Sequence, residues 1–142
     1  MRISARSDYA CKAMLELAFH WPSKDPLPIH LISEKQNIPM RYLVQILIQL
    51  KRIGFVVSLR GKDGGYLLAC KPREITLGEL LYKIQGKFLQ RAHSRHDTKK
   101  DKVFSSIWQN VDTAIDEILN KISFEDIANK IKKMDKTIIY QI

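Results

Sequence analysis

Cysteine is scarce in this chain: its 142 residues include two, Cys11 and Cys70, which lie far apart and form no CxxC pair. Disulfide-stapled folds and zinc fingers need several cysteines at short spacings, so the sequence excludes both classes. No motif supports a redox or ligand role for either cysteine. We expect both side chains to pack as small apolar groups.

Long apolar runs are also missing. No stretch of about 18 apolar residues occurs, which excludes a helix that spans a membrane. Residues 1–4 lack the apolar core of a signal peptide. The sequence therefore predicts a cytoplasmic protein with no membrane partner.

Catalytic motifs are absent as well. The four histidines are scattered, none belongs to an HExxH motif, and the sequence contains neither a P-loop nor a GxGxxG pattern. His93 and His96 have a spacing that fits two metal ligands on one helical turn. Four neighbouring cations oppose a bound metal ion there: Arg91, Arg95, Lys99 and Lys100. We predict that the chain is not an enzyme, that it has no metal site, and that both histidines are solvated.

Positive charge is what the sequence has in excess, with a net charge of +9. Residues 1–72 hold eleven Lys/Arg against five acids, and residues 87–102 hold six against two. Residues 73–86 balance at two each, and residues 103–142 hold five bases and six acids. A basic half beside a near-neutral half favours a polyanionic partner, although charge alone fits a merely basic protein equally well.

Proline and apolar periodicity divide the basic half into three predicted helices. Apolar residues recur at helical spacing between residues 4 and 21, and Pro22 ends that segment. Pro28 suits the first position of a short second helix, Asn37 suits its end, and Pro39 opens a third helix. Two short helices separated by three or four residues have the spacing of a helix-turn-helix.

The third predicted helix has two distinct faces. Its buried face follows the i, i+3, i+4, i+7 rule with Leu43, Ile46, Leu47 and Leu50. The opposite face consists of long polar side chains and one apolar neighbour: Arg41, Gln45, Arg52, Gln49 and Ile48. Long side chains of this kind can reach base edges or phosphates.

A predicted two-stranded ribbon follows. Residues 55–59 and 66–69 are rich in β-branched and apolar residues, and three glycines lie between them at 61, 64 and 65. The glycines predict a hairpin loop with positive backbone dihedrals and allow a close approach to DNA, unless they serve only the turn. Arg60 and Lys62 place two cations at the loop tip. A ribbon after a helix-turn-helix predicts a winged helix that binds DNA.

The C-terminal half is predicted to be helical apart from one loop. Thr76 with Glu79 forms a capping box before a fourth helix that ends near residue 85. A fifth helix carries six apolar residues at heptad spacing, too many for a small domain to cover, which predicts a dimer interface: Phe104, Trp108, Val111, Ile115, Ile118 and Ile122. Ser123 with Asp126 caps a sixth helix. The predicted parts are a winged helix at 1–86, a basic surface loop at 87–102, and dimerisation and C-terminal helices at 103–142.

Several segments resemble the Rrf2 family of winged-helix transcriptional regulators. They are Ile3-Ser4 with Tyr9-Ala10, the helix-turn-helix at 32–43, the wing at 54–68, residues 75–79 and the helix around Trp108, about residues 1–135 in all. The resemblance implies a mostly α homodimer with a small β-hairpin, in which the third helix and the wing bind a palindromic operator. By position, it implies that Met40, Arg41, Tyr42 and Gln45 face the major groove and that Arg60 and its glycine neighbours form the wing contact. Together with the polar face of the third helix and the ribbon, the predicted DNA-binding residues of this expected repressor are Met40, Arg41, Tyr42, Gln45, Gln49, Arg52, Arg60, Gly61, Lys62, Gly64, Gly65 and Tyr66. The alternative is a winged helix that docks on another protein.

Two departures from the family pattern matter. The third helix begins Pro39-Met40-Arg41 rather than with the more common serine-containing version, so we expect a different operator. The best-known members hold an iron–sulfur cluster with three cysteines in the loop before the fifth helix, and this loop has none. Aligned on Trp108, the ligand positions fall near Gln90, His96, Lys102 and Ser105. We therefore expect no cluster. Activity would be set by a protein partner, a small ligand or expression level.

Overall fold

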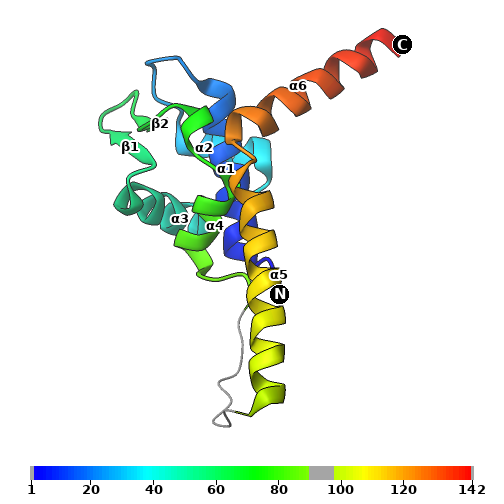
Figure 1. Cartoon of the computed structure of the whole chain (residues 1–142). Helices are drawn as coiled ribbons and strands as arrows, with labels where there is room; N and C mark the ends of the chain where they lie inside the picture. Colours follow the sequence, from blue (N-terminus) through cyan, green and yellow to red (C-terminus); the bar gives the residue numbers. More distant parts are fainter. Residues whose placement is uncertain (1, 90–97, 142) are drawn as a thin grey trace.

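The computed structural model describes the backbone of residues 2–89 and 98–141, and the side chains as far as residue 137. Its elements are α1 (Ala5–His20), α2 (Ile29–Gln36), α3 (Met40–Ile53), β1 (Val56–Leu59), β2 (Gly65–Leu68), η1 (Pro72–Glu74), α4 (Leu77–Gln85), α5 (Lys99–Asn120) and α6 (Phe124–Gln141) (Figure 1). This confirms the predicted class, mostly helical with one antiparallel hairpin and a long helix near the C-terminus. His93 and His96 lie outside the described residues.

Local capping explains where the helices begin and end. Asn37 and Gly54 adopt left-handed backbone conformations, with φ of 52° and 97°, and close α2 and α3. A capping box that was not predicted from the sequence starts α5 at Lys99: Thr98 Oγ1 accepts from Asp101 N at 3.2 Å, and Thr98 N donates to Asp101 Oδ2 at 3.2 Å. Residues 99–102 are therefore helical and do not belong to the predicted loop.

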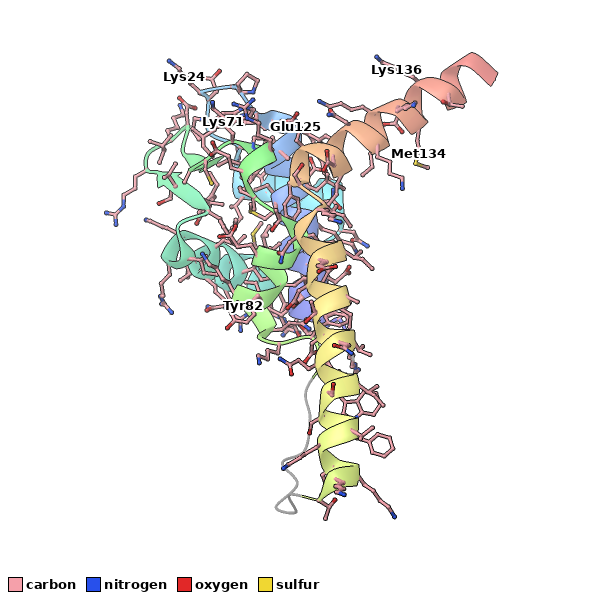
Figure 2. The ribbon with its side chains drawn as sticks, in the orientation of Figure 1. Lys24, Lys71, Tyr82, Glu125, Met134 and Lys136 are labelled. Atoms are coloured by element: carbon pink, nitrogen blue, oxygen red, sulfur yellow. The ribbon has the colours of Figure 1, made fainter. Side chains whose placement is uncertain are left out.

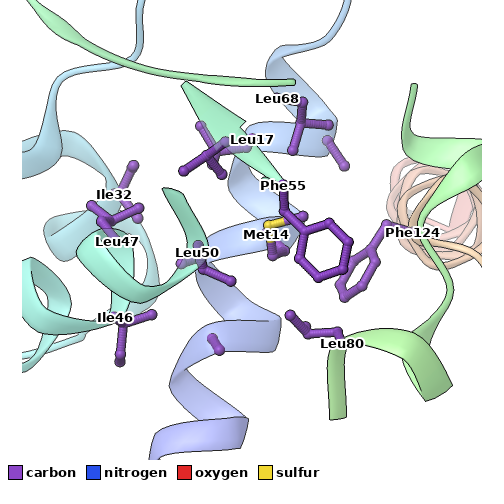
Figure 3. Packing of buried hydrophobic residues seen from close by; sticks show 14 of the residues in the cluster. Met14, Leu17, Ile32, Ile46, Leu47, Leu50, Phe55, Leu68, Leu80 and Phe124 are labelled. Atoms are coloured by element: carbon purple, nitrogen blue, oxygen red, sulfur yellow. The ribbon is translucent and has the colours of Figure 1, made fainter. Parts of the chain in front are cut away.

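One hydrophobic core joins the helix-turn-helix, the wing and the start of α6. Figure 3 shows the cluster around Met14 of α1, with side chains from α3, α4 and α6: Leu50, Leu80 and Phe124. Phe124 is 1% exposed, so the first turns of α6 belong to the core of the winged helix rather than to a separate C-terminal part. The rest of α6, with Met134 and Lys136, projects from the domain (Figure 2).

The C-terminal end of α5 is fixed to α4, while its N-terminal half extends past the domain (Figure 1). Leu77 N donates to Ile122 O at 2.8 Å, and Phe124 N donates to Ile75 O at 3.0 Å. A Cβ at Gly78 would collide with the side chain of Asn120, so the absence of a side chain lets the two helices meet. Among the helices of residues 2–89 and 98–141, none has the length and apolar character needed to cross a bilayer.

Candidate DNA-binding surface

Helix α3 presents the predicted polar face to solvent. Leu43, Ile46, Leu47 and Leu50 are all buried in the core. Arg41, Gln45 and Arg52 are exposed on the opposite side, as a 3.6-residue period requires. The two ion pairs among the described residues, Asp8–Lys12 and Glu79–Lys83, involve no residue of α3 or the wing. The cations of this face are therefore not neutralised by those pairs.

Helix α1 supports the first turn of α3 through an aromatic stack. The rings of Tyr9 and Tyr42 stack with centroids 6.1 Å apart. The guanidinium of Arg41 lies 4.9 Å from the centroid of the Tyr42 ring, and its Nη2 donates to Tyr42 Oη at 3.3 Å. Tyr9 thus holds Tyr42, which in turn restrains Arg41. Tyr9 was not predicted as part of this surface, because no periodicity pairs residues on two different helices.

Gln49 differs from the other residues predicted on α3. It lies seven residues from Tyr42 and hence on the same side of the helix, and it is half-buried. Its Oε1 is buried and has no hydrogen-bond partner among the described residues. Gln49 lies four residues from Gln45 and three from Arg52, so it borders their exposed face while its Oε1 is covered.

The wing is the antiparallel pair β1 and β2, with a register from Val56↔Leu68 to Leu59↔Gly65. Its tip is exposed at Arg60, Gly61 and Lys62. Lys51 at the end of α3 donates from Nζ to Ser58 Oγ at 2.6 Å, which links the wing to α3. An open groove lies between the wing tip and the start of α2, with basic side chains from both sides on its wall: His30, Lys51, Arg60 and Lys62.

The three wing glycines have different roles, which corrects the sequence interpretation. Of the three, only Gly61 has a positive φ, 118°, and nothing lies within 4 Å of where its Cβ would be. A Cβ at Gly64 would collide with Leu59 O, and a Cβ at Gly65 would collide with Leu27 O. The close neighbour at Gly64 and Gly65 is thus the protein's own backbone.

Tyr66 anchors the wing to the rest of the domain. Its backbone N donates to Leu27 O at 2.9 Å, and Leu27 N donates to Tyr66 O at 2.9 Å. Its side chain is half-buried and packs against the core. These interactions fasten the wing to the segment before α2, so that the tip is held beside α3.

Helix α5 carries the predicted apolar face, and no side chain along its 22 residues is fully buried. Phe104, Trp108 and Ile118 are 58%, 42% and 63% exposed. Val111, Ile115 and Ile122 are half-buried. Val103 and Ile107 add two exposed apolar side chains that lie off the heptad seam. The uncovered face is therefore broader than the sequence predicted.

Both cysteines lie in surroundings that disfavour the thiolate. Burial raises the pKa of Cys11, on α1, to about 11, and the Asp8 carboxylate adds to the shift. Burial also raises the pKa of Cys70, which follows β2, with a further contribution from Glu74. Both thiols are thus held against the thiolate form that binds iron. Within residues 2–89 and 98–141, no group of three or more His, Cys, Asp and Glu side chains is placed to hold a metal ion.

Comparison with known proteins finds the same architecture. The Rrf2 family model, described as an iron-dependent transcriptional regulator, matches residues 3–130. The HTH-type transcriptional regulator IscR of Pectobacterium carotovorum is 31% identical over 138 residues, 95% of this chain and 84% of IscR. The structure of IscR from T. potens gives a TM-score of 0.77 at 30% identity, covering 94% of this chain and 90% of that one. The structure of CymR (YrzC), the global cysteine regulator of B. subtilis, gives a TM-score of 0.79 at 28% identity. The match covers 92% of this chain and 98% of the CymR chain.

Proposed function

The chain belongs to the Rrf2 family of transcriptional regulators, and we propose that it is a homodimeric repressor that binds a palindromic operator in the cytoplasm. The observation that carries the proposal is the joint exposure of the polar face of α3 and the cationic wing tip. The hydrogen bond between Lys51 and Ser58 keeps these two surfaces together. The polar face of α3 would enter the major groove, and the wing tip would follow the adjacent phosphates.

The direct test is a selection from a random pool of duplexes with the full-length protein. The proposed function predicts an enriched palindrome with two half-sites, one for each α3 of the dimer. Binding that is equal for all duplexes, or absent, would instead favour the alternative in which the winged helix docks on another protein.

Substitutions in the wing and in α3 should have separable effects on DNA binding. Arg60→Ala should weaken all duplexes alike and reduce the slope of log affinity against log salt by about one unit for each phosphate that the protein no longer neutralises. Gln45→Ala should cost about 1–3 kcal/mol and relax the preference at one or two base pairs. Lys136→Ala, on the projecting part of α6, is the control and should leave both properties unchanged (Figure 2). An unaltered selected operator for Gln45→Ala would contradict the major-groove assignment.

We also propose that this protein works without an iron–sulfur cluster, so that a protein partner, a small ligand or expression level alone sets its activity. The raised pKa values of Cys11 and Cys70, and their positions on separate elements, support this proposal. Protein purified without oxygen should contain no stoichiometric iron or sulfide and should bind its operator with the same affinity after treatment with a chelator. A brown protein with stoichiometric iron and a visible absorption band would contradict the proposal.

A further inference from the structure

A row of apolar side chains runs along α3 beside its polar face. Met40, Val44 and Ile48 are spaced four residues apart and therefore lie on one side of the helix. They are 41%, 36% and 43% exposed, although the same helix buries four other apolar residues completely. Packing within the domain therefore does not account for this row.

The apolar row is adjacent to the residues that face DNA in the proposed function. Ile48 lies three residues after Gln45 and four before Arg52, so it shares their side of α3, and Val44 lies one turn before Ile48 at the edge of that face. Val44 and Ile48 are both β-branched and hold essentially one χ1 rotamer on a helix, so little side-chain entropy is lost when they are contacted. The other exposed apolar face belongs to α5, and α3 lies on the opposite side of the domain from that helix (Figure 1).

Charge identifies the partner of this row as DNA rather than an apolar protein surface. Helix α3 contains three cations, Arg41, Lys51 and Arg52, and no acidic residue. A protein groove suited to Val44 and Ile48 would have to desolvate the flanking arginines, whereas DNA supplies phosphates to them. In the major groove the apolar feature is the C5-methyl group of thymine.

We propose that Val44 and Ile48 are specificity-determining residues that read thymine methyl groups in each half-site. This inference rests on the proposed function and assigns part of its sequence preference to two residues outside the polar set. Removal of one thymine methyl group should reduce affinity about fourfold, the ratio that corresponds to burying one methyl group.

The test replaces thymines of the selected operator one at a time by deoxyuridine, which lacks only the methyl group, at the same position of both half-sites. For the wild-type dimer we expect affinity to fall about fifteenfold at one or two positions, because the duplex then lacks two methyl groups that the dimer would bury. Ile48→Ala should bind thymine and deoxyuridine duplexes equally at one of these positions, and Val44→Ala at the other. Met134→Ala, an exposed apolar residue on α6, should retain the full sensitivity.

Each outcome decides the inference separately from the proposed function. Two results would contradict the proposal that Val44 and Ile48 read methyl groups. One is that the wild type binds every deoxyuridine duplex as tightly as the thymine duplex; the other is that both alanine variants still distinguish thymine from deoxyuridine. Neither result would contradict the proposed function. Failure to select any operator overturns the proposed function itself. Because both side chains are exposed, the variants should keep the wild-type circular dichroism spectrum, and Ile48→Val should keep part of the discrimination.

Discussion

Ile118→Asp should convert the proposed dimer into a folded monomer, with a dimer dissociation constant raised at least about a hundredfold. Ile118 is 63% exposed on α5, so the aspartate costs the isolated chain little. In the proposed dimer the same position is buried, and each interface would have to desolvate two carboxylates, one from each chain. Burial of each large side chain on this face contributes about 2–3 kcal/mol. Sedimentation of the wild type and the variant over a range of concentrations measures the change.

Gln109→Asp is the matched control, because it adds the same charge at an exposed position nine residues from Ile118 and therefore on the opposite face of α5. It should leave the dimer intact. The Ile118→Asp monomer should keep a cooperative thermal transition of its winged helix, at a lower midpoint because dimerisation no longer stabilises the folded state. It should bind the palindrome far more weakly, since the two half-sites no longer act together. A wild-type protein that is monomeric at micromolar concentration would contradict the proposed dimer.

The features predicted correctly from sequence were those encoded within one element. The period of Leu43, Ile46, Leu47 and Leu50 sufficed to orient α3, because a buried face of a helix fixes the opposite one. The hairpin followed from a β-branched run, a glycine-rich loop and a second apolar run. Composition misled in one place: the basic character of residues 99–102 suggested a loop, although Thr98 and Asp101 form a capping box that starts α5.

Contacts between elements could not be predicted in the same way. The stack joins Tyr9 of α1 to Tyr42 of α3, two residues 33 positions apart in sequence, and no local pattern predicts a contact at that separation. Ser123 and Asp126 predicted where α6 begins, but not that Phe124 in its first turn packs into the core of the winged helix. The partial burial of Gln49 likewise depends on what packs beside α3, which no pattern within the helix specifies.

Gly65 shows the same limit with the largest expected consequence for folding. Two explanations of this glycine make opposite predictions: close approach to DNA, as inferred from sequence, or close approach to the backbone of Leu27, as found in the structure. Gly65→Ala should lower the free energy of unfolding by about 2–4 kcal/mol, because the new Cβ would collide with Leu27 O and Pro28 N. Those are backbone atoms, so relief requires separating the wing from the segment before α2 and breaking the two Leu27–Tyr66 hydrogen bonds.

The control is Gly61→Ala, in the same loop, where nothing lies within 4 Å of the new Cβ. Its positive φ should cost about 1 kcal/mol, which the solvent-exposed tip can partly relieve by relaxing. Thermal and urea unfolding of the three proteins separates the two explanations of Gly65. If Gly65→Ala unfolds like the wild type and loses only affinity for DNA, the glycine serves the approach of DNA. If it is less stable than Gly61→Ala and loses affinity for every duplex alike, it serves to hold the wing against the domain so that Arg60 and Lys62 lie beside α3.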